Sequence, residues 1–243
     1  MATRHAIYGR PGACYLDMPD DVIQGTCDLD DIVQVERVPE PPRMIAPTEN
    51  VEAALDLLEN AERPLVIVGK GMAWARAEDE VRGFIDRTQL PFLRSPMGKG
   101  VVPDDHPMSV AAARTLALQQ ADVIFLMGAR FNWIFHFGLP PRFDKDVKII
   151  QLDIAPEEIG HNKPSEVALV GDGKAIMGQV NQALEGRQWF YPKDTPWRSA
   201  LGEKMSSNAA QIKPLIDDDA EPANYYRALR DVAAWMPENV VLS

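Results

Sequence analysis

The chain has 243 residues, of which 46% are hydrophobic and 25% are charged, and its formal net charge is −11 at pH 7. These values are ordinary for a soluble globular protein with a sizeable core. The acidic balance argues against nucleic acid and membranes as partners, because phosphate-rich surfaces require a local excess of Lys and Arg. No apolar run approaches the roughly 20 residues that span a bilayer, and two cysteines, Cys14 and Cys27, favour a reducing compartment over a disulfide framework.

The first 47 residues predict little regular structure. The stretch "ACYLDMP", residues 13–19, has the composition of a short β-strand closed by proline, with Cys14 in its interior. Residues 20–47 are acidic and proline-rich and end in "VPEPPRMIAP". Because proline fixes φ and removes a backbone donor, this part is predicted to be an extended linker.

Helical and strand patterns then alternate up to residue 186. Helices are predicted over "VEAALDLLENA", "AEDEVRGFIDRTQ", "SVAAARTLALQQA" and "KAIMGQVNQALEG", and the first of them should bury Val51, Ala54, Leu55 and Leu58. Continuous apolar runs predict buried strands at "PLVIVGKG", "LPFLR", "DVIFLMGAR", "DVKIIQLDI" and "EVALVGD". Pro156 suits the first turn of a helix after the fourth strand. The alternation predicts an α/β fold with a doubly wound, mostly parallel sheet.

The composition changes again after residue 186. Trp, Pro and polar residues predict a linker region up to about residue 221. The stretch "NYYRALRDVAAWMPENVVLS" then predicts a helix followed by a strand, as at the start of a second α/β unit.

Each predicted strand ends in glycine or a charged residue: "GKG" at 69–71, "GAR" at 128–130, Asp153, and "GDG" at 171–173. The carboxyl ends of parallel strands share one edge, where glycines admit a ligand to backbone N–H groups. Lys70 and Arg130 offer charge to phosphates, and Asp153 can accept hydrogen bonds from a ribose. Singly, each has an ordinary alternative, namely a strand exit for GKG, a helix cap for Asp153 and a solvated charge for Arg130. Together they favour a nucleotide-binding edge, although no NAD fingerprint or P-loop is present.

Other candidates are weaker. His106, His136 and His161 lack metal-ligand spacing, so structural roles are predicted for them. Trp133 and Phe135 lie in "FNWIFHFG" and either pack locally or clamp an adenine or pantetheine group; the sequence leaves both readings open.

Several long stretches resemble one enzyme family. "IYGRPGACYLDMP", "PLVIVGKGMAWARAE", "PFLRSPMGKGVVPDDHP" and "IIQLDIAPEEIG" are similar to the 2-hydroxyacyl-CoA lyases, thiamine diphosphate enzymes close to the oxalyl-CoA decarboxylases. The resemblance covers almost the whole chain. It implies that residues 1–24 end a pyrimidine-binding domain, 25–47 form a linker, 48–186 form the central nucleotide-binding-type domain, 187–221 form a second linker region, and 222–243 begin a diphosphate-binding domain. We therefore expect a fragment centred on the central domain.

The resemblance also implies the chemistry of the parent enzyme. Such lyases cleave the C1–C2 bond of a 2-hydroxyacyl-CoA to formyl-CoA and a shortened aldehyde in fatty acid α-oxidation, with thiamine diphosphate as electron sink. We expect thiamine diphosphate and Mg²⁺ to bind mainly outside this chain and no catalytic residue to lie within it, so that the chain alone is inactive. The parent is expected to be a homo-oligomer, a dimer or tetramer, in the peroxisome or cytoplasm. Three alternatives stay open: an oxalyl-CoA decarboxylase, a non-catalytic ADP- or CoA-binding module, and an assembly fragment without a ligand.

The resemblance also implies which residues of this chain contact ligands. In these enzymes a Gly-Asp-Gly metal motif is completed by a later asparagine, whereas the corresponding part of this chain reads "PWRSALGEKM". Asp172 is therefore not expected to be a magnesium ligand. Contacts to ADP are implied for Arg10, Lys70, Arg130 and Asp153, the adenine edge for Asp172 and Gly173, and contacts to the CoA substrate for Ala111, Ala112, Ala113, Arg114 and Thr115, with Arg114 suited to a phosphate.

Overall fold

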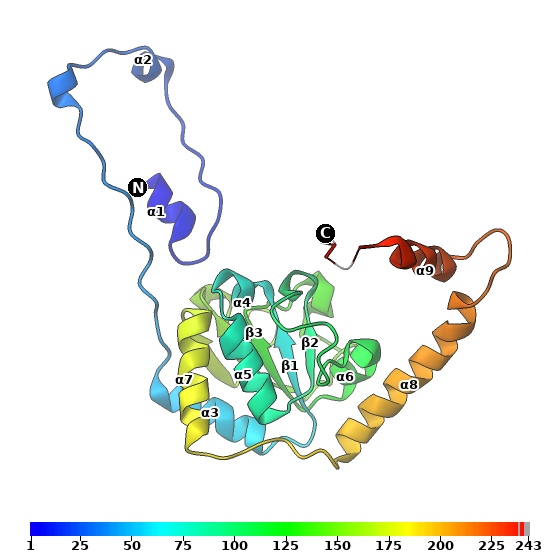
Figure 1. Cartoon of the computed structure of the whole chain (residues 1–243). Coiled ribbons are helices and arrows are strands. Elements are labelled where there is room, and N and C mark those ends of the chain that lie inside the picture. Colours follow the sequence, from blue (N-terminus) through cyan, green and yellow to red (C-terminus); the bar gives the residue numbers. More distant parts are fainter. Residues whose placement is uncertain (238, 241–243) are drawn as a thin grey trace.

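A five-stranded parallel sheet forms the centre of the protein in this computed structural model, which describes residues 1–237, 239 and 240 (Figure 1). The strands are β1 (Pro64–Val68), β2 (Phe92–Arg94), β3 (Val123–Met127), β4 (Lys148–Asp153) and β5 (Val167–Val170), in the order β2-β1-β3-β4-β5. All neighbouring pairs are parallel. The predicted α/β fold with a doubly wound sheet is confirmed, and each of the five strands predicted between residues 48 and 186 is present.

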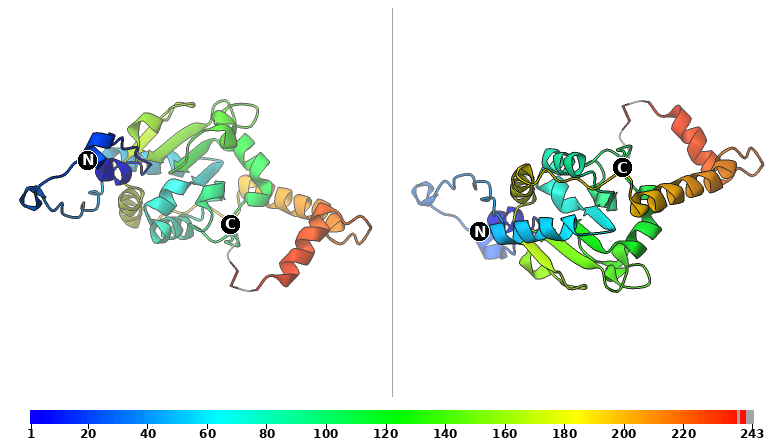
Figure 2. Two further views of the ribbon diagram at one scale, coloured as in Figure 1. Left: turned by 90° about the horizontal axis from the view of Figure 1, so that it is seen from above. Right: turned by 90° about the horizontal axis from the view of Figure 1, so that it is seen from below.

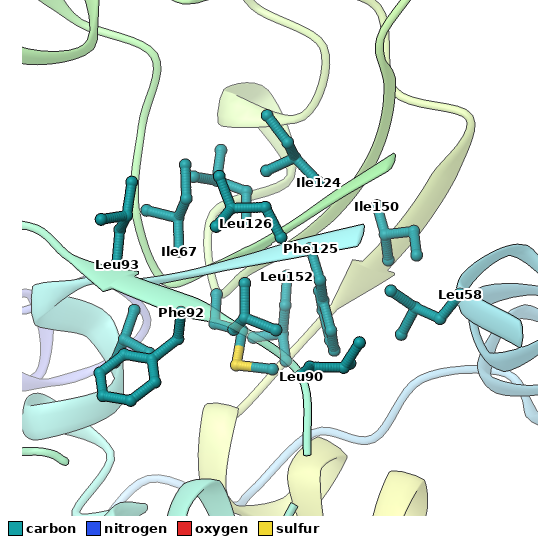
Figure 3. Close-up of a cluster of buried hydrophobic side chains, with 14 of the residues drawn as sticks. Leu58, Ile67, Leu90, Phe92, Leu93, Ile124, Phe125, Leu126, Ile150 and Leu152 are labelled. Atoms are coloured by element: carbon teal, nitrogen blue, oxygen red, sulfur yellow. The ribbon is translucent and has the colours of Figure 1, made fainter. Parts of the chain in front are cut away.

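The two central strands β1 and β3 are buried along their whole length, which explains their unbroken apolar sequences. Val66 of β1 lies in register with Phe92 on one side and Phe125 on the other. Phe125 meets Phe84 edge to face, with ring centroids 5.9 Å apart. Figure 3 shows the aliphatic and aromatic side chains that fill this core around the strands.

Helices cover both faces of the sheet. Helices α3 (Thr48–Glu59), α5 (Glu78–Thr88) and α7 (Gly173–Glu185) contact one another, α3 with α7 and α7 with α5, and cover one face. The four residues predicted to face the core from α3 are all buried. The crossover from β2 back over β1 to β3 carries η3 (Ala111–Ala113) and α6 (Arg114–Gln120) and, being right-handed, places them on the opposite face.

Short elements sit at the carboxyl edge of the sheet. They are α4 (Lys70–Trp74), η2 (Pro96–Gly98), η4 (Trp133–Gly138) and η5 (Pro156–Glu158). The helix predicted after the fourth strand is only this three-residue 3₁₀ turn, η5. Gly160 follows it with a φ of 70°, which turns the chain away before a second helical turn can form.

The structured domain extends past residue 186. The predicted linker region contains α8 (Pro196–Ile216), which begins at the amino end of β1. There the indole of Trp197, only 3% exposed, donates a hydrogen bond to the Pro64 carbonyl at 3.0 Å. The first turns of α8 therefore belong to the same core, although the composition of residues 187–195 is that of a loop.

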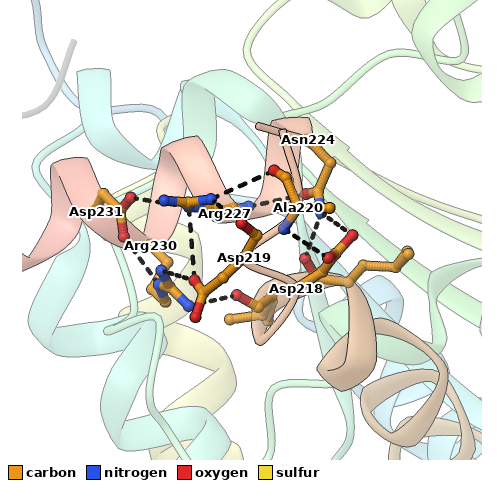
Figure 4. A network of polar contacts seen from close by, with 9 residues as sticks. Asp218, Asp219, Ala220, Asn224, Arg227, Arg230 and Asp231 are labelled. Atoms are coloured by element: carbon orange, nitrogen blue, oxygen red, sulfur yellow. Dashed lines mark hydrogen bonds and ion pairs between the residues drawn. The ribbon is translucent and has the colours of Figure 1, made fainter. Parts of the chain in front are cut away.

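Helix α9 (Tyr225–Trp235) follows α8 and buries none of its residues. Figure 4 shows the network that fixes the turn between them. Arg230 bonds the Ile216 carbonyl at the end of α8 and the Asp219 carboxylate, and Arg227 bonds the Asp219 carbonyl. The strand predicted after this helix falls largely on residues 238 and 241–243, which lie outside the described part of the chain.

The N-terminal 47 residues form a long excursion that carries α1 (Ala2–Ile7), α2 (Asp20–Ile23) and η1 (Leu29–Asp31). The strand predicted at residues 13–19 is wrong: this stretch is irregular and exposed, because no strand edge lies beside it. Cys14 is therefore exposed rather than in an apolar interior. The N-terminal excursion and α9 lie on opposite sides of the domain (Figure 2).

Candidate functional site

A cavity of about 520 Å³ opens at the carboxyl edge of the sheet, within the size range of small-molecule and cofactor sites. Every strand contributes a residue at or just beyond its carboxyl end. These are Lys70 after β1, Ser95 after β2, Arg130 after β3, Asp153 on β4 and Asp172 after β5. The N-terminal excursion supplies further lining through Ile7, Gly9, Arg10, Pro11, Glu40, Pro41 and Arg43. The cavity is thus formed by the sheet edge on one side and the excursion on another.

Close backbone approach shapes the floor of the cavity. Gly71 after β1 donates its N–H to the Gly128 carbonyl after β3 at 2.9 Å. Gly128 has a φ of 57°, and a Cβ on it would lie 2.7 Å from the Gly71 Cα. Any larger residue would therefore push the two loops apart.

Cationic groups and one carboxylate meet at the mouth. The Nη1 atoms of Arg10 and Arg130 donate to the same Glu158 oxygen, Oε1, at 2.7 and 2.9 Å. Lys70 lies on the first turn of α4 with its ammonium group 5.1 Å from the ring centroid of Trp74. Three predicted cations therefore line one cavity, where phosphate oxygens could accept their hydrogen bonds.

Asp153 ends β4 and is buried in the cavity wall. Its Oδ1 accepts a hydrogen bond from the Ala155 N–H at 3.0 Å. Burial raises the pKa of this carboxyl group, and the nearby Glu158 adds to the rise while the Ala155 N–H opposes it. The second carboxylate oxygen has no hydrogen-bond partner among the described residues, so it can accept a ligand hydroxyl.

Asp172 has a structural role that the sequence analysis did not assign to it. Its Oδ1 accepts the Ala175 N–H at 2.9 Å as the N-cap of α7, and it also pairs with Arg43 at 2.7 Å. The Asp172 N–H donates to the Met44 carbonyl, which fastens the end of the N-terminal excursion to the sheet. Asp172 and Gly173 nevertheless line the cavity, so the predicted adenine-edge role stays a prediction.

Of the five residues predicted to contact CoA, two line a cavity and three do not. Ala111 and Arg114 line a second, shallower hollow, which shares Ser95, Pro96 and Ile134 with the main cavity and also contains Arg94 and Lys99. The Arg114 guanidinium lies over the Phe135 ring at 4.8 Å, and burial lowers its pKa. Ala112, Ala113 and Thr115 line neither cavity; the Ala112 carbonyl accepts from Asn208 of α8.

The loop aromatics have different environments. Phe135 is buried at 2% exposure and lines the main cavity, whereas Trp133 is 73% exposed. The structure thus favours packing for Phe135 and leaves Trp133 as a surface residue. Three residues of the site were missed from sequence: Arg43, Glu158 and Trp74. "GKGMAW" and "APEEIG" contained the last two, but nothing in their spacing distinguished them from ordinary surface residues.

The described residues contain no group of three or more His, Cys, Asp or Glu side chains that could hold a metal ion. The Asp172 carboxylate is engaged by a helix terminus and an arginine. We therefore assign no step of thiamine chemistry to this part of the chain. None of its described helices is long and apolar enough to cross a membrane.

The sequence matches the family described as thiamine pyrophosphate enzyme, central domain, over residues 51–180. It is 47% identical to 2-hydroxyacyl-CoA lyase 1 of Homo sapiens over 238 residues, covering 98% of this chain and 41% of that protein. It is 42% identical to 2-hydroxyacyl-CoA lyase of Oryza sativa subsp. japonica over 251 residues, covering 98% and 43%. It is 40% identical to oxalyl-CoA decarboxylase of Escherichia coli (strain K12) over 242 residues, covering 98% and 42%. The chain thus spans less than half the length of these curated relatives.

Proposed function

Because this chain belongs to the family of thiamine pyrophosphate enzyme central domains, we propose that it is the nucleotide-binding central part of a 2-hydroxyacyl-CoA lyase. The parent enzyme would cleave the C1–C2 bond of a 2-hydroxyacyl-CoA to formyl-CoA and a shortened aldehyde. The identity to proteins of that name, 47% and 42%, supports the reaction class. Thiamine diphosphate would supply the electron sink, and Mg²⁺ would hold its diphosphate, mainly through residues outside this chain.

The role proposed for this chain is to bind an adenine nucleotide, ADP, in the main cavity. The single observation that carries the proposal is that Arg10, Lys70, Arg130 and Asp153 all line one cavity at the carboxyl edge of the sheet. The two arginines and the lysine would bind the diphosphate, and the Asp153 carboxylate would accept from the ribose hydroxyls. Glycine-rich turns after β1 and β3 leave room for the phosphates beside the backbone.

The second hollow is proposed to receive phosphate groups of the CoA thioester. Arg114 is half-buried there, and Arg94 and Lys99 lie on the same wall, although both pair with Asp104. Three cations around one hollow provide charge for a phosphorylated ligand. The parent would be a homo-oligomer, a dimer or tetramer, located in the peroxisome or cytoplasm.

Calorimetric titration with ADP tests the nucleotide proposal. We expect wild-type protein to bind ADP and Asp153→Ala to bind it at least about tenfold more weakly, because a ribose hydrogen bond to a charged group is lost. Asp146→Ala is the matched control, since that aspartate is exposed and pairs only with its neighbour Lys145. No binding by the wild type would refute the proposal, and equal binding by Asp153→Ala would refute the assigned pose.

Titration with CoA tests the second hollow. Arg114→Ala should weaken CoA binding, whereas Arg142→Ala, at an exposed arginine outside both cavities, should not. An equal effect of both variants would indicate non-specific attraction of the CoA phosphates rather than a site.

Oxalyl-CoA decarboxylase is a second candidate, favoured by the 40% identity to the Escherichia coli enzyme. Mass-spectrometric assay of the parent enzyme with 2-hydroxyacyl-CoA and with oxalyl-CoA separates the two. Aldehyde release from the first substrate supports the lyase, and turnover of oxalyl-CoA alone supports the decarboxylase. The present chain by itself should release no formyl-CoA from either substrate; detectable release would show that catalytic groups lie within it.

A further inference from the structure

Glu158 joins two arginines that lie 120 positions apart in the sequence, Arg10 and Arg130. Both guanidinium groups donate to the same oxygen, Oε1, and the carboxylate is only 15% exposed, whereas the arginines are nearly half exposed. Two like charges held at one atom repel each other unless an anion lies between them. The Glu158 carboxylate, which pairs with two lining arginines but is not itself part of the cavity lining, is that anion in the ligand-free protein.

The sheet fixes the position of Glu158. Gln151 on β4, a buried polar residue at 2% exposure, donates to the Glu158 carbonyl at 2.8 Å and accepts from the Gly160 N–H at 2.9 Å. The Glu158 N–H donates to the Ala155 carbonyl at 3.1 Å. The backbone after Glu158 is therefore anchored to β4 and the backbone before it to the turn at Ala155, so its carboxylate is presented from a fixed support.

Residues 1–19 depend on this contact. Within residues 1–237, 239 and 240, the bond from Arg10 to Glu158 is the only hydrogen bond that joins residues 1–19 to residue 48 or beyond. Yet Ile7, Gly9, Arg10 and Pro11 line the main cavity. The Glu158 carboxylate is thus the direct hydrogen-bond link from this wall of the cavity to the sheet, while Tyr8 donates to the Pro39 carbonyl within the N-terminal excursion at 3.1 Å.

We infer that Glu158 is a positioning residue of the cavity: it keeps Arg10 beside Arg130 and holds residues 7–11 as the cavity wall until an anionic ligand binds. A diphosphate offers oxygens to the same two guanidinium groups, and its binding joins residues 1–19 to the sheet by a second route. The assignment of the ligand as a nucleoside diphosphate rests on the proposed function. The role of Glu158 in the ligand-free protein does not.

Hydrogen–deuterium exchange of the purified chain tests the ligand-free part. The variants are Glu158→Gln, which keeps the shape but removes the charge, and Glu157→Gln, the exposed neighbour, as the matched control. In Glu158→Gln we expect peptides covering residues 1–12, where the N–H groups of His5, Tyr8 and Gly12 are hydrogen-bonded, to exchange about fivefold faster than in the wild type, while β1 and β3 peptides are unchanged. Glu157→Gln should match the wild type throughout. Wild-type exchange of residues 1–12 in Glu158→Gln would overturn the inference.

A second variant distinguishes loss of the local contact from a general loss of structure in Glu158→Gln. Arg10→Gln removes the same contact from the other side and leaves the β4 support untouched. It should give the same local increase in exchange. If Glu158→Gln accelerates exchange in the strands as well, that variant is destabilised as a whole, and the test of the contact then rests on Arg10→Gln. Normal protection of residues 1–12 in Arg10→Gln would overturn the inference.

Saturating ADP tests the role of the ligand. In Glu158→Gln, ADP should restore slow exchange of residues 1–12, whereas adenosine, which lacks phosphates, should not. Restoration would not follow from a merely structural role of Glu158. If ADP binds Glu158→Gln in calorimetry but leaves residues 1–12 unprotected, the ligand does not join the arginines and that part is refuted. If ADP does not bind the wild type, the proposed function fails while the ligand-free result still decides the role of Glu158.

Discussion

Substitution of Asp172 separates its role as a helix cap from its role as an ion-pair partner. Oδ1 accepts the Ala175 N–H at the start of α7 and pairs with Arg43, whose side chain is 48% exposed. Replacing a capping aspartate by alanine costs about 1 kcal/mol, with a range of roughly 0.5 to 2. A pair with a half-exposed arginine contributes about 0.5 kcal/mol after solvent screening. Asp172→Ala should therefore lower the free energy of unfolding by about 1.5 kcal/mol.

Asp172→Asn gives a different expectation. Asparagine is as good an N-cap as aspartate, so only the ion pair is lost and the cost should be about 0.5 kcal/mol. Arg43→Ala removes the same pair from its other end together with a hydrogen bond to the Ala75 carbonyl at 3.3 Å, so it should cost at least as much as Asp172→Asn. Urea denaturation followed by tryptophan fluorescence measures all three variants, and parallel slopes would show that the denatured state is unchanged.

Equal losses of stability in Asp172→Asn and Asp172→Ala would refute the assigned capping role of Asp172. That outcome would mean that the charge, and not the cap, is the main contribution of this residue. It would also leave Asp172 with a charge-specific role at the cavity, which ADP titration of the asparagine variant would then reveal.

Three further predictions concern single contacts. The raised pKa of Asp153 means that the folded state favours the protonated carboxyl, so its stabilising contribution is complete below pH 3.8 and is lost as the pH rises through the folded-state pKa. Asp153→Asn should therefore increase the free energy of unfolding at pH 7 but not below pH 3.8, and equal changes at both would contradict this. Gly128→Ala places a Cβ 2.7 Å from the Gly71 Cα at a positive φ and should cost about 2 kcal/mol in urea denaturation; an unchanged midpoint would show that the loops can separate freely. Trp197→Phe keeps a buried ring but loses the hydrogen bond to the Pro64 carbonyl. The free energy of unfolding, measured by thermal denaturation, should therefore fall by about 1 kcal/mol. An unchanged value would mean that another donor replaces the indole.

The fold and the location of the site could be predicted because both depend on local patterns. The short apolar runs at 64–68 and 123–127, each followed by glycine, are typical of strands covered on both faces, and parallel strands bring their carboxyl ends to one edge. Lys70, Arg130 and Asp153 therefore had to lie near one another, and all three line the main cavity.

Contacts between distant segments could not be predicted in the same way. The composition of residues 13–19 suits a strand, but a strand needs a partner edge, and no sequence pattern shows that this edge is missing. The pairing of Arg10 and Arg43 with Glu158 and Asp172 depends on how a proline-rich excursion returns to the domain. The helix expected after β4 is a single turn because Gly160 redirects the chain, and that short turn is what leaves Glu158 facing the arginines.

The two ends of β1 carry tryptophans with opposite surroundings. Trp74 follows the carboxyl end, is 59% exposed and lines the main cavity, whereas Trp197 is buried against Pro64 at the amino end. Of these two, a ligand entering the cavity changes the solvent around Trp74, while loss of the core changes the solvent around Trp197. Two of the five tryptophans thus report occupancy and folding from opposite ends of the same five-residue strand. A single-tryptophan variant that keeps either one would allow ligand titration and unfolding to be followed optically without an added label.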